Sequence, residues 1–129
     1  MMRCVRILVV DGANVVGAVP DGWWRDRAGA ADRLHTGLVA GPLPYDAIVL
    51  VLEGKARAGV PAGEDGSVTT VHAPGEGDDE IVVQCRALAA DGAQVTLATA
   101  DRALIARVSD RAVEVLGPRT LRSWLAHAP

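Results

Sequence analysis

Several acidic residues of this sequence lie shortly after or before its apolar segments. The acids are Asp11, after residues 7–10; Glu53, after residues 47–52; Asp101, just after residues 94–99; and Asp78 with Asp79, ahead of a helical segment. Because neither His nor Cys accompanies them, these oxygen ligands suit a hard cation, Mg²⁺ or Mn²⁺. Such ions bind substrate phosphates and activate water. The pattern therefore indicates metal-dependent phosphoryl chemistry.

An acid in such a place can also be a helix cap. Aspartate is favoured at helix starts, where it accepts backbone N–H groups and complements the helix dipole. This interpretation fits Asp101 and Asp78 about as well as a functional one does. Asp11 and Glu53 differ, because glycine-rich segments that we predict as loops follow them. A carboxylate that closes a buried strand with no helix to cap needs a partner, and we interpret that partner as a cation.

The segments that would position these acids alternate between strand-like apolar runs and segments with the apolar spacing of a helix. Strands are expected at residues 4–10, 47–52, 67–73, 94–99 and 112–117, and helices at 23–39, 81–89, 104–108 and 118–128. Loops are expected at residues 12–22, 54–66 and 74–79. Strands that are apolar on both faces and alternate with helices predict an α/β domain, with a mainly parallel sheet between two layers of helices. Residues 1–129 suit a single domain. In such a sheet, ligands bind beyond the carboxyl ends of the strands.

The net charge of −3 argues against nucleic-acid binding by bulk charge. Local cations are nevertheless expected near the acidic end of the sheet, where they would hold a phosphodiester backbone. One of the neighbouring residues Trp23 and Trp24 is expected to anchor the helix, and the other could stack on a base. We choose Trp23 as the substrate-binding one. The expected substrate-binding cations are Arg25, Arg27, Lys55, Arg57 and Arg102.

The start of the chain becomes polar too soon for a signal peptide. No apolar run approaches the roughly 18–20 residues of a membrane span. We therefore expect a cytoplasmic protein without membrane contact.

Four short blocks of the sequence carry a family resemblance. They are "VVDGANVVG", "LVLEG", "GEGDDEIV" and "TLATADRAL", and they span about residues 7–105. The chain resembles the NYN domain, in particular its YacP-like branch within the PIN-like nuclease superfamily. The resemblance implies a PIN-like fold with strand order 3-2-1-4-5. It also implies a ribonuclease that hydrolyses RNA with Mg²⁺ or Mn²⁺.

The same resemblance implies roles for individual residues. Asp11, Asp78 and Asp101 correspond to the metal-binding acids, and Asn14 to an asparagine that orients a carboxylate or touches a phosphate. Glu53 and Asp79 would be secondary ligands or groups that orient water. The chain departs from the family pattern at Glu53, where Asp is more frequent, at Ala13, which replaces an aromatic residue, and at Ala100, which replaces Ser.

Other functions are compatible with parts of the pattern. The departures at Glu53 and Ala100 would also suit a module of the same fold that lacks activity and binds RNA or a protein partner. A receiver-like phosphoacceptor would need a lysine after the last strand, and the sole lysine, Lys55, is elsewhere. A small-molecule phosphohydrolase would use the same metals. A homo-oligomer is a further expectation, because the third predicted strand could lie at a sheet edge and pair with another chain.

Overall fold

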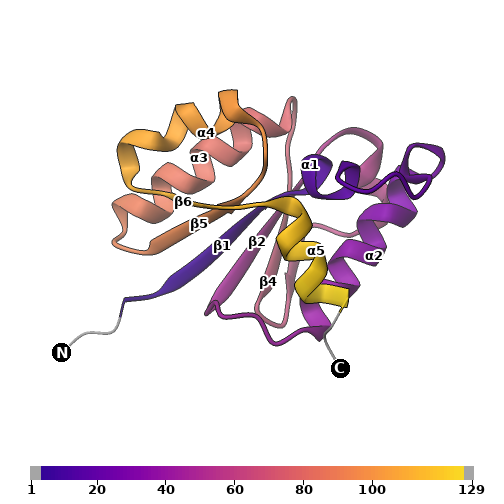
Figure 1. Ribbon diagram of the computed structural model, residues 1–129, viewed down its shortest axis with the longest axis horizontal. Coiled ribbons are helices and arrows are strands. Elements are labelled where there is room, and N and C mark those ends of the chain that lie inside the picture. The colour runs from indigo at the N-terminus through magenta and orange to yellow at the C-terminus, as the bar shows by residue number, and fades with distance from the viewer. Residues whose placement is uncertain (1–3, 127–129) are drawn as a thin grey trace.

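The computed structural model describes residues 4–126, which form one α/β domain around a six-stranded sheet (Figure 1). The strand order is β3-β4-β2-β1-β5-β6, and every neighbouring pair is parallel except β3 with β4. The strands are β1 (Arg6–Asp11), β2 (Ala47–Leu52), β3 (Gly63–Asp65), β4 (Val68–His72), β5 (Gln94–Ala98) and β6 (Glu114–Leu116).

The predicted class and the order of the five predicted strands are confirmed. The structure adds β3, which lies within the segment predicted as the loop 54–66. Gly66 has a φ of +60° in the turn between β3 and β4, a conformation that glycine adopts without strain. Because β3 covers β4, the expectation that the third predicted strand lies at a sheet edge is wrong. Oligomer formation stays a prediction.

Helices cover both faces of the sheet (Figure 1). On one face lie α1 (Gly12–Gly17), α2 (Arg27–Ala40) and α5 (Pro118–Ala126), and on the other α3 (Gly77–Ala90) and α4 (Arg102–Val108). Short 3₁₀ helices form η1 (Trp23–Arg25), η2 (Gly54–Gly59) and η3 (Ser109–Arg111). The last two residues of the predicted helix 118–128 lie outside the described part of the chain. No helix within residues 4–126 is long and apolar enough to cross a membrane.

The core consists of aliphatic side chains that alternate along the strands. In β1, Leu8 and Val10 pack under α1, α2 and α5, whereas Val9 between them packs under α3 and α4. All three are fully buried. Strands covered on both faces read as continuous apolar runs, which explains why β1, β2 and β5 were predicted close to their observed bounds.

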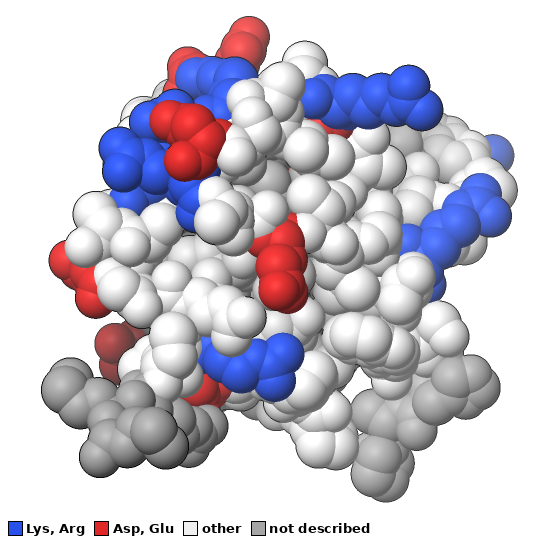
Figure 2. Space-filling view, turned by 60° about the vertical axis from the view of Figure 1, so that its left-hand side comes forward, with Lys and Arg blue, Asp and Glu red and all other residues white. Residues whose placement is uncertain are grey.

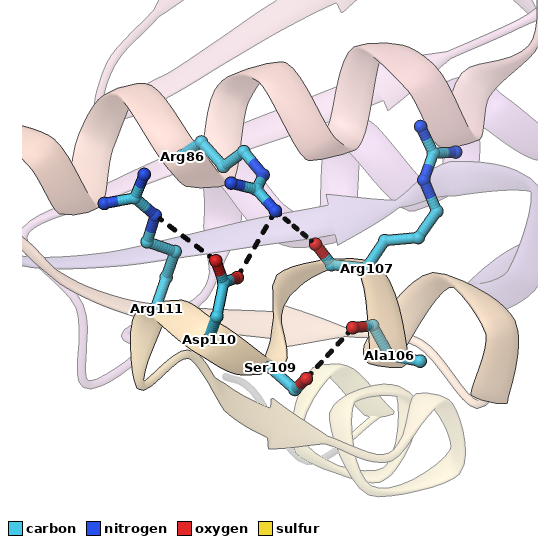
Figure 3. A network of polar contacts seen from close by, with 6 residues as sticks. All are labelled: Arg86, Ala106, Arg107, Ser109, Asp110 and Arg111. Atoms are coloured by element: carbon cyan, nitrogen blue, oxygen red, sulfur yellow. Dashed lines mark hydrogen bonds and ion pairs between the residues drawn. The ribbon is translucent and has the colours of Figure 1, made fainter.

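Polar contacts fasten α4 onto α3 (Figure 3). The Arg86 guanidinium of α3 donates to the carbonyl of Arg107 at 2.9 Å and to the Asp110 carboxylate at 3.3 Å. Ser109 donates to the carbonyl of Ala106 at 2.9 Å, which closes the end of α4. The two helices therefore form one layer. Both begin near the carboxyl ends of the parallel strands, where the predicted acids lie.

Candidate active site

The acidic residues predicted from the sequence gather at one edge of the sheet. Because β1, β2 and β5 are parallel, their carboxyl ends meet there. Asp11 is the last residue of β1, Glu53 follows β2 directly, and Asp101 lies shortly after β5. Asp78 is the second residue of α3. Four elements that are distant in sequence thus supply acids to one region.

Asp11 is buried, with an exposed fraction of 6%, and both its carboxylate oxygens accept hydrogen bonds. Oδ2 accepts from the Thr99 hydroxyl at 2.9 Å, and Oδ1 accepts from the Asn14 backbone N–H at 3.3 Å. The second bond makes Asp11 the N-cap of α1. The prediction that no helix follows Asp11 is therefore wrong. The glycines of residues 12–22 indicated a loop throughout. In the structure the segment begins with the short capped helix α1, and the loop follows that helix.

Gly12 allows α1 to begin directly at the end of the sheet. A Cβ atom at this position would lie 2.6 Å from the carbonyl oxygen of Val51 and 2.8 Å from Cδ2 of Leu52. Side chains do not approach so closely, so only glycine fits without movement of β2. This packing fixes α1, and hence the Asn14 N–H, relative to Asp11.

The segment after β5 is tied to β1 and α1 by two further hydrogen bonds. Thr99 is buried, and its hydroxyl accepts from the Asp101 N–H at 3.1 Å while donating to Asp11. The Asn14 side-chain oxygen accepts from the Ala100 N–H at 2.9 Å. The Asn14 side-chain oxygen therefore holds the segment after β5 in place. Thr99 was missed from the sequence, although its place between an apolar strand and an acid was a signal.

Asp101 serves as a helix cap. Its Oδ1 accepts from the N–H groups of Ala103 at 3.0 Å and Leu104 at 3.2 Å, at the start of α4. The capping interpretation is thus confirmed for this acid. A carboxylate oxygen that accepts backbone N–H groups is held in one orientation, so Asp101 has a fixed position beside Asp78.

Glu53 also caps a helix, but one that is distant in sequence. Its Oε2 accepts from the N–H of Gly77, the first residue of α3, at 2.9 Å. Glu76, at the N-cap position itself, makes no side-chain cap. The prediction that Glu53 has no helix to cap is therefore wrong. Through this contact Glu53 sets the position of α3 and of Asp78 on its first turn.

The charges of these acids influence one another. Burial raises the pKa of Asp11, hydrogen bonds from Thr99 and Asn14 oppose that rise, and the carboxylates of Asp78 and Glu53 add to it. Partial burial also raises the pKa of Asp78, and the charges of Asp101 and Glu53 raise it further. Both carboxyl groups hold protons more tightly than usual, because burial disfavours their charged forms and neighbouring carboxylates add to that effect.

Asp79 points away from this group. Its side chain is 71% exposed, and Oδ1 accepts from the Arg107 guanidinium of α4 at 3.0 Å. The pair therefore helps to hold α3 to α4. The expectation that Asp79 orients water or a metal draws no support from this contact.

The donor set at the acidic edge suits a hard cation, although the acids do not form a closed cage. Within residues 4–126, no group of three or more His, Cys, Asp and Glu side chains is arranged to hold a metal ion. Mg²⁺ is usually bound by one or two carboxylates and keeps several waters, so it does not need such a cage. Asp11 and Asp78, whose charges repel, have the chemistry that a divalent cation would neutralise.

The predicted substrate-binding residues take different places. Trp23, Arg27 and Lys55 line a pocket of about 460 Å³ that Gly12 and Glu53 also border. The acidic edge therefore opens into a cavity with an aromatic ring and two cations, and these three predicted residues adjoin the predicted site.

The other predicted cations have local roles or stand apart. Arg57 donates to the carbonyls of Gly54 at 3.1 Å and Ala73 at 3.4 Å, which holds η2 against the end of β4. Arg25 lies over the Trp24 ring at 6.0 Å, and Arg102 is exposed at the start of α4. Figure 2 shows basic and acidic side chains interspersed on one face, separated by uncharged surface.

Comparison of the fold with solved structures supports the resemblance carried by the motifs. Rae1 (YacP) from Bacillus subtilis superposes with a TM-score of 0.74 and 18% identity, over 95% of this chain and 74% of that one. The chain shares the fold of Rae1 (YacP). A mutant form of Rae1 (YacP) gives a TM-score of 0.72 and 20% identity, over 95% of this chain and 76% of that one.

The likeness to Rae1 (YacP) is one of fold, because identities of 18–20% are too low to carry individual functions. No protein-family model matches the chain, and none of the curated proteins matches it. The YacP-like resemblance predicted from four blocks of sequence thus agrees with the three-dimensional comparison.

Proposed function

We propose that this protein is a metal-dependent endoribonuclease that hydrolyses RNA phosphodiester bonds, with Mg²⁺ or Mn²⁺ bound where Asp11, Asp78 and Asp101 lie, by one or two of these carboxylates and by water. The observation that carries the proposal is the convergence of these acids from three elements. The pKa values of Asp11 and Asp78 are raised partly by neighbouring carboxylates. The shared fold with Rae1 (YacP) agrees with the YacP-like motifs that first suggested this activity.

The residues around the acids would keep their oxygens in place during the reaction. Thr99 and the Asn14 N–H orient Asp11, backbone N–H groups of α4 orient Asp101, and Glu53 fixes the helix that carries Asp78. A bound metal would supply an activated water as the nucleophile and neutralise charge on the phosphate. Preorganised ligands matter because small displacements of reacting groups cost large factors in rate.

Cations beside the acidic edge would hold the RNA backbone. Lys55 lies close to Glu53 in sequence and lines the same pocket, and Arg27 faces that pocket from α2. Arg102 is exposed beside Asp101. Their charges would offset the repulsion between an acidic site and a polyanion, and contacts of this kind position a strand without reading its sequence.

Cleavage of end-labelled RNA by purified protein tests the proposal. Wild type is compared with Asp11→Asn in Mn²⁺, in Mg²⁺ and in EDTA, and Asp32→Asn, at an exposed position of α2, serves as a control. We expect metal-dependent cleavage by wild type and by Asp32→Asn, and a loss of cleavage with Asp11→Asn. Equal cleavage by wild type and Asp11→Asn would overturn the proposal.

A module of the same fold that binds RNA or a protein without cleaving is the second candidate. It is favoured by the cap formed by Asp101 and by the ion pair of Asp79, which occupy two predicted site acids with structural contacts. Calorimetric titration with Mn²⁺ separates the candidates. A nuclease should bind Mn²⁺ saturably, whereas the inactive module should show no saturable binding below millimolar concentrations.

A further inference from the structure

The cavity next to the acidic edge is built from three segments. It lies where α1, the start of α2 with η1, and η2 come together, and we refer to it as the α1–η2 pocket. Gly12, one of its lining residues, follows Asp11 directly, and Glu53, another, follows β2. A ligand with one group in this pocket could therefore place a second, nearby group at the acids.

The α1–η2 pocket is lined by both apolar and charged side chains. Ala13, Val16 and Leu52 contribute small aliphatic surfaces, and the cations Arg27 and Lys55 also line it. This combination suits a flat ring that has apolar faces and is attached to an anionic group. A phosphate alone would gain nothing from the aliphatic part, and a purely apolar ligand would gain nothing from the cations.

Trp23 and Arg27 form the aromatic side of the α1–η2 pocket. The guanidinium carbon of Arg27 lies 4.9 Å from the centroid of the Trp23 ring, and Trp23 itself packs against the core. The indole is thereby held against the core, and the Arg27 guanidinium lies over its ring. Guanidinium planes and aromatic rings are the surfaces on which proteins stack unpaired bases.

The size of the pocket sets a further limit on its ligand. A volume of about 460 Å³ falls within the range of roughly 300–1,000 Å³ typical of small-ligand pockets. A base inside a duplex is stacked on both faces and enters a pocket only after it is extruded. A single strand presents its bases without the energy needed to unpair and unstack them.

We infer that the α1–η2 pocket receives one unpaired nucleobase of the RNA strand whose phosphate lies at the acidic edge. This inference rests on the proposed nuclease function, because it assumes that RNA is the ligand of the site. It assigns binding roles to Ala13, Val16 and the pair of Trp23 and Arg27, and it predicts that a duplex, whose bases are paired, binds more weakly than a single strand.

Binding to labelled oligonucleotides, measured by fluorescence anisotropy in EDTA, tests the inference without cleavage. The probes are a short single-stranded RNA and the duplex of the same sequence. Ala13→Leu fills the pocket from an exposed helical position, and Ala87→Leu makes the same change on the exposed face of α3 as a matched control. Lys55→Ala removes a cation at an exposed position and serves as a second variant, which does not depend on how Ala13→Leu folds.

We expect wild type and Ala87→Leu to bind single-stranded RNA alike and the duplex more weakly. Ala13→Leu should weaken single-strand binding by about tenfold, which corresponds to the loss of one stacked base. Lys55→Ala should weaken it as well. Equal binding of the two probes by wild type, or unchanged single-strand binding by both Ala13→Leu and Lys55→Ala, would overturn the inference.

Cleavage assays on the same variants in Mn²⁺ separate this inference from the proposed function. If Asp11→Asn abolishes cleavage while Ala13→Leu and Lys55→Ala bind and cleave as wild type does, the pocket inference fails and the nuclease stands. If wild type does not cleave but Ala13→Leu loses single-strand binding, the nuclease fails and the pocket assignment stands.

Discussion

The hydroxyl of Thr99 donates a hydrogen bond of 2.9 Å to Oδ2 of Asp11, although the two residues are 88 positions apart in the chain. The same hydroxyl oxygen accepts the N–H of Asp101. One buried side chain therefore links two of the acids to which we assign the metal. The geometry of the site depends on this link as much as on the acids themselves.

Thr99→Val should impair both the fold and the site. Valine keeps the shape of threonine but leaves the buried Asp11 oxygen and the Asp101 N–H without their partner, at a cost of about 1–3 kcal/mol in the free energy of unfolding. Thr99→Ser keeps the hydroxyl and serves as the control. Chemical unfolding and RNA cleavage should both show a clear loss for valine and a small one for serine. Two variants with equal cleavage would show that the hydroxyl is not needed.

Asp11→Asn should stabilise the protein when metal is absent. Burial, aided by Asp78 and Glu53, raises the pKa of Asp11 above its ordinary value of 3.8. The folded protein therefore binds more protons than the unfolded chain between these two pKa values, and wild-type stability falls as pH rises through that window. Asparagine does not titrate, so the variant escapes this loss.

Thermal unfolding in EDTA checks the stability of Asp11→Asn. The unfolding midpoint of the variant should exceed that of wild type at about pH 7, and the difference should shrink as the pH falls toward about 4. Asp32→Asn should show no such pH-dependent difference. Added Mn²⁺ should raise the midpoint of wild type but not that of Asp11→Asn, because a ligand stabilises only the form that binds it. A variant less stable than wild type at neutral pH would contradict the account.

Glu53 should act through its contact with α3. Glu53→Ala removes the acceptor for the Gly77 N–H, and lost caps cost about 0.5–2 kcal/mol of stability. Glu53→Gln keeps an acceptor oxygen and should remain close to wild type in stability. Cleavage should fall on the order of tenfold to a hundredfold for alanine, because Asp78 is displaced, and only slightly for glutamine. Equal loss of cleavage in both variants would instead make the carboxylate charge itself essential.

Gly12→Ala should destabilise the protein even though alanine favours helices. The added Cβ would lie 2.6 Å from the Val51 carbonyl oxygen, and overpacking of this kind costs about 1–3 kcal/mol. Gly75→Ala is the matched control, because nothing lies within 4 Å of a Cβ at that position. Denaturant titration of both variants measures the difference. A Gly12→Ala protein as stable as wild type would show that α1 does not need its close approach to β2.

The parts of the fold that could be predicted from the sequence are those with a strong hydrophobic period. Residues 47–52 were predicted as a strand and form β2 with the same bounds, because a strand buried on both faces is apolar throughout. By contrast, β3 consists of three exposed residues, Gly63–Asp65, which carry no such period. It pairs with β4 through a turn of two residues, Gly66 and Ser67, and a Gly-Ser pair between two strands is a hairpin signal that the loop prediction missed.

The candidate site was predicted in its location but not in its local contacts. Parallel strands bring their carboxyl ends together, so Asp11, Asp78 and Asp101 could be placed at one edge in advance. The cap that Glu53 provides for Gly77 joins residues 24 positions apart and has no local signature. The helix after Asp11 was missed because it is short and contains glycines, which serve close packing there rather than flexibility.

The central claim is that a divalent metal ion binds at the acidic edge where Asp11, Asp78 and Asp101 lie. Anomalous diffraction from a crystal soaked in Mn²⁺ measures this directly, with a crystal of Asp11→Asn soaked in the same way as the control. The account predicts an anomalous peak among these three carboxylates in wild type and its loss in the variant. A wild-type crystal without a peak there, at Mn²⁺ concentrations that support RNA cleavage in solution, would contradict it.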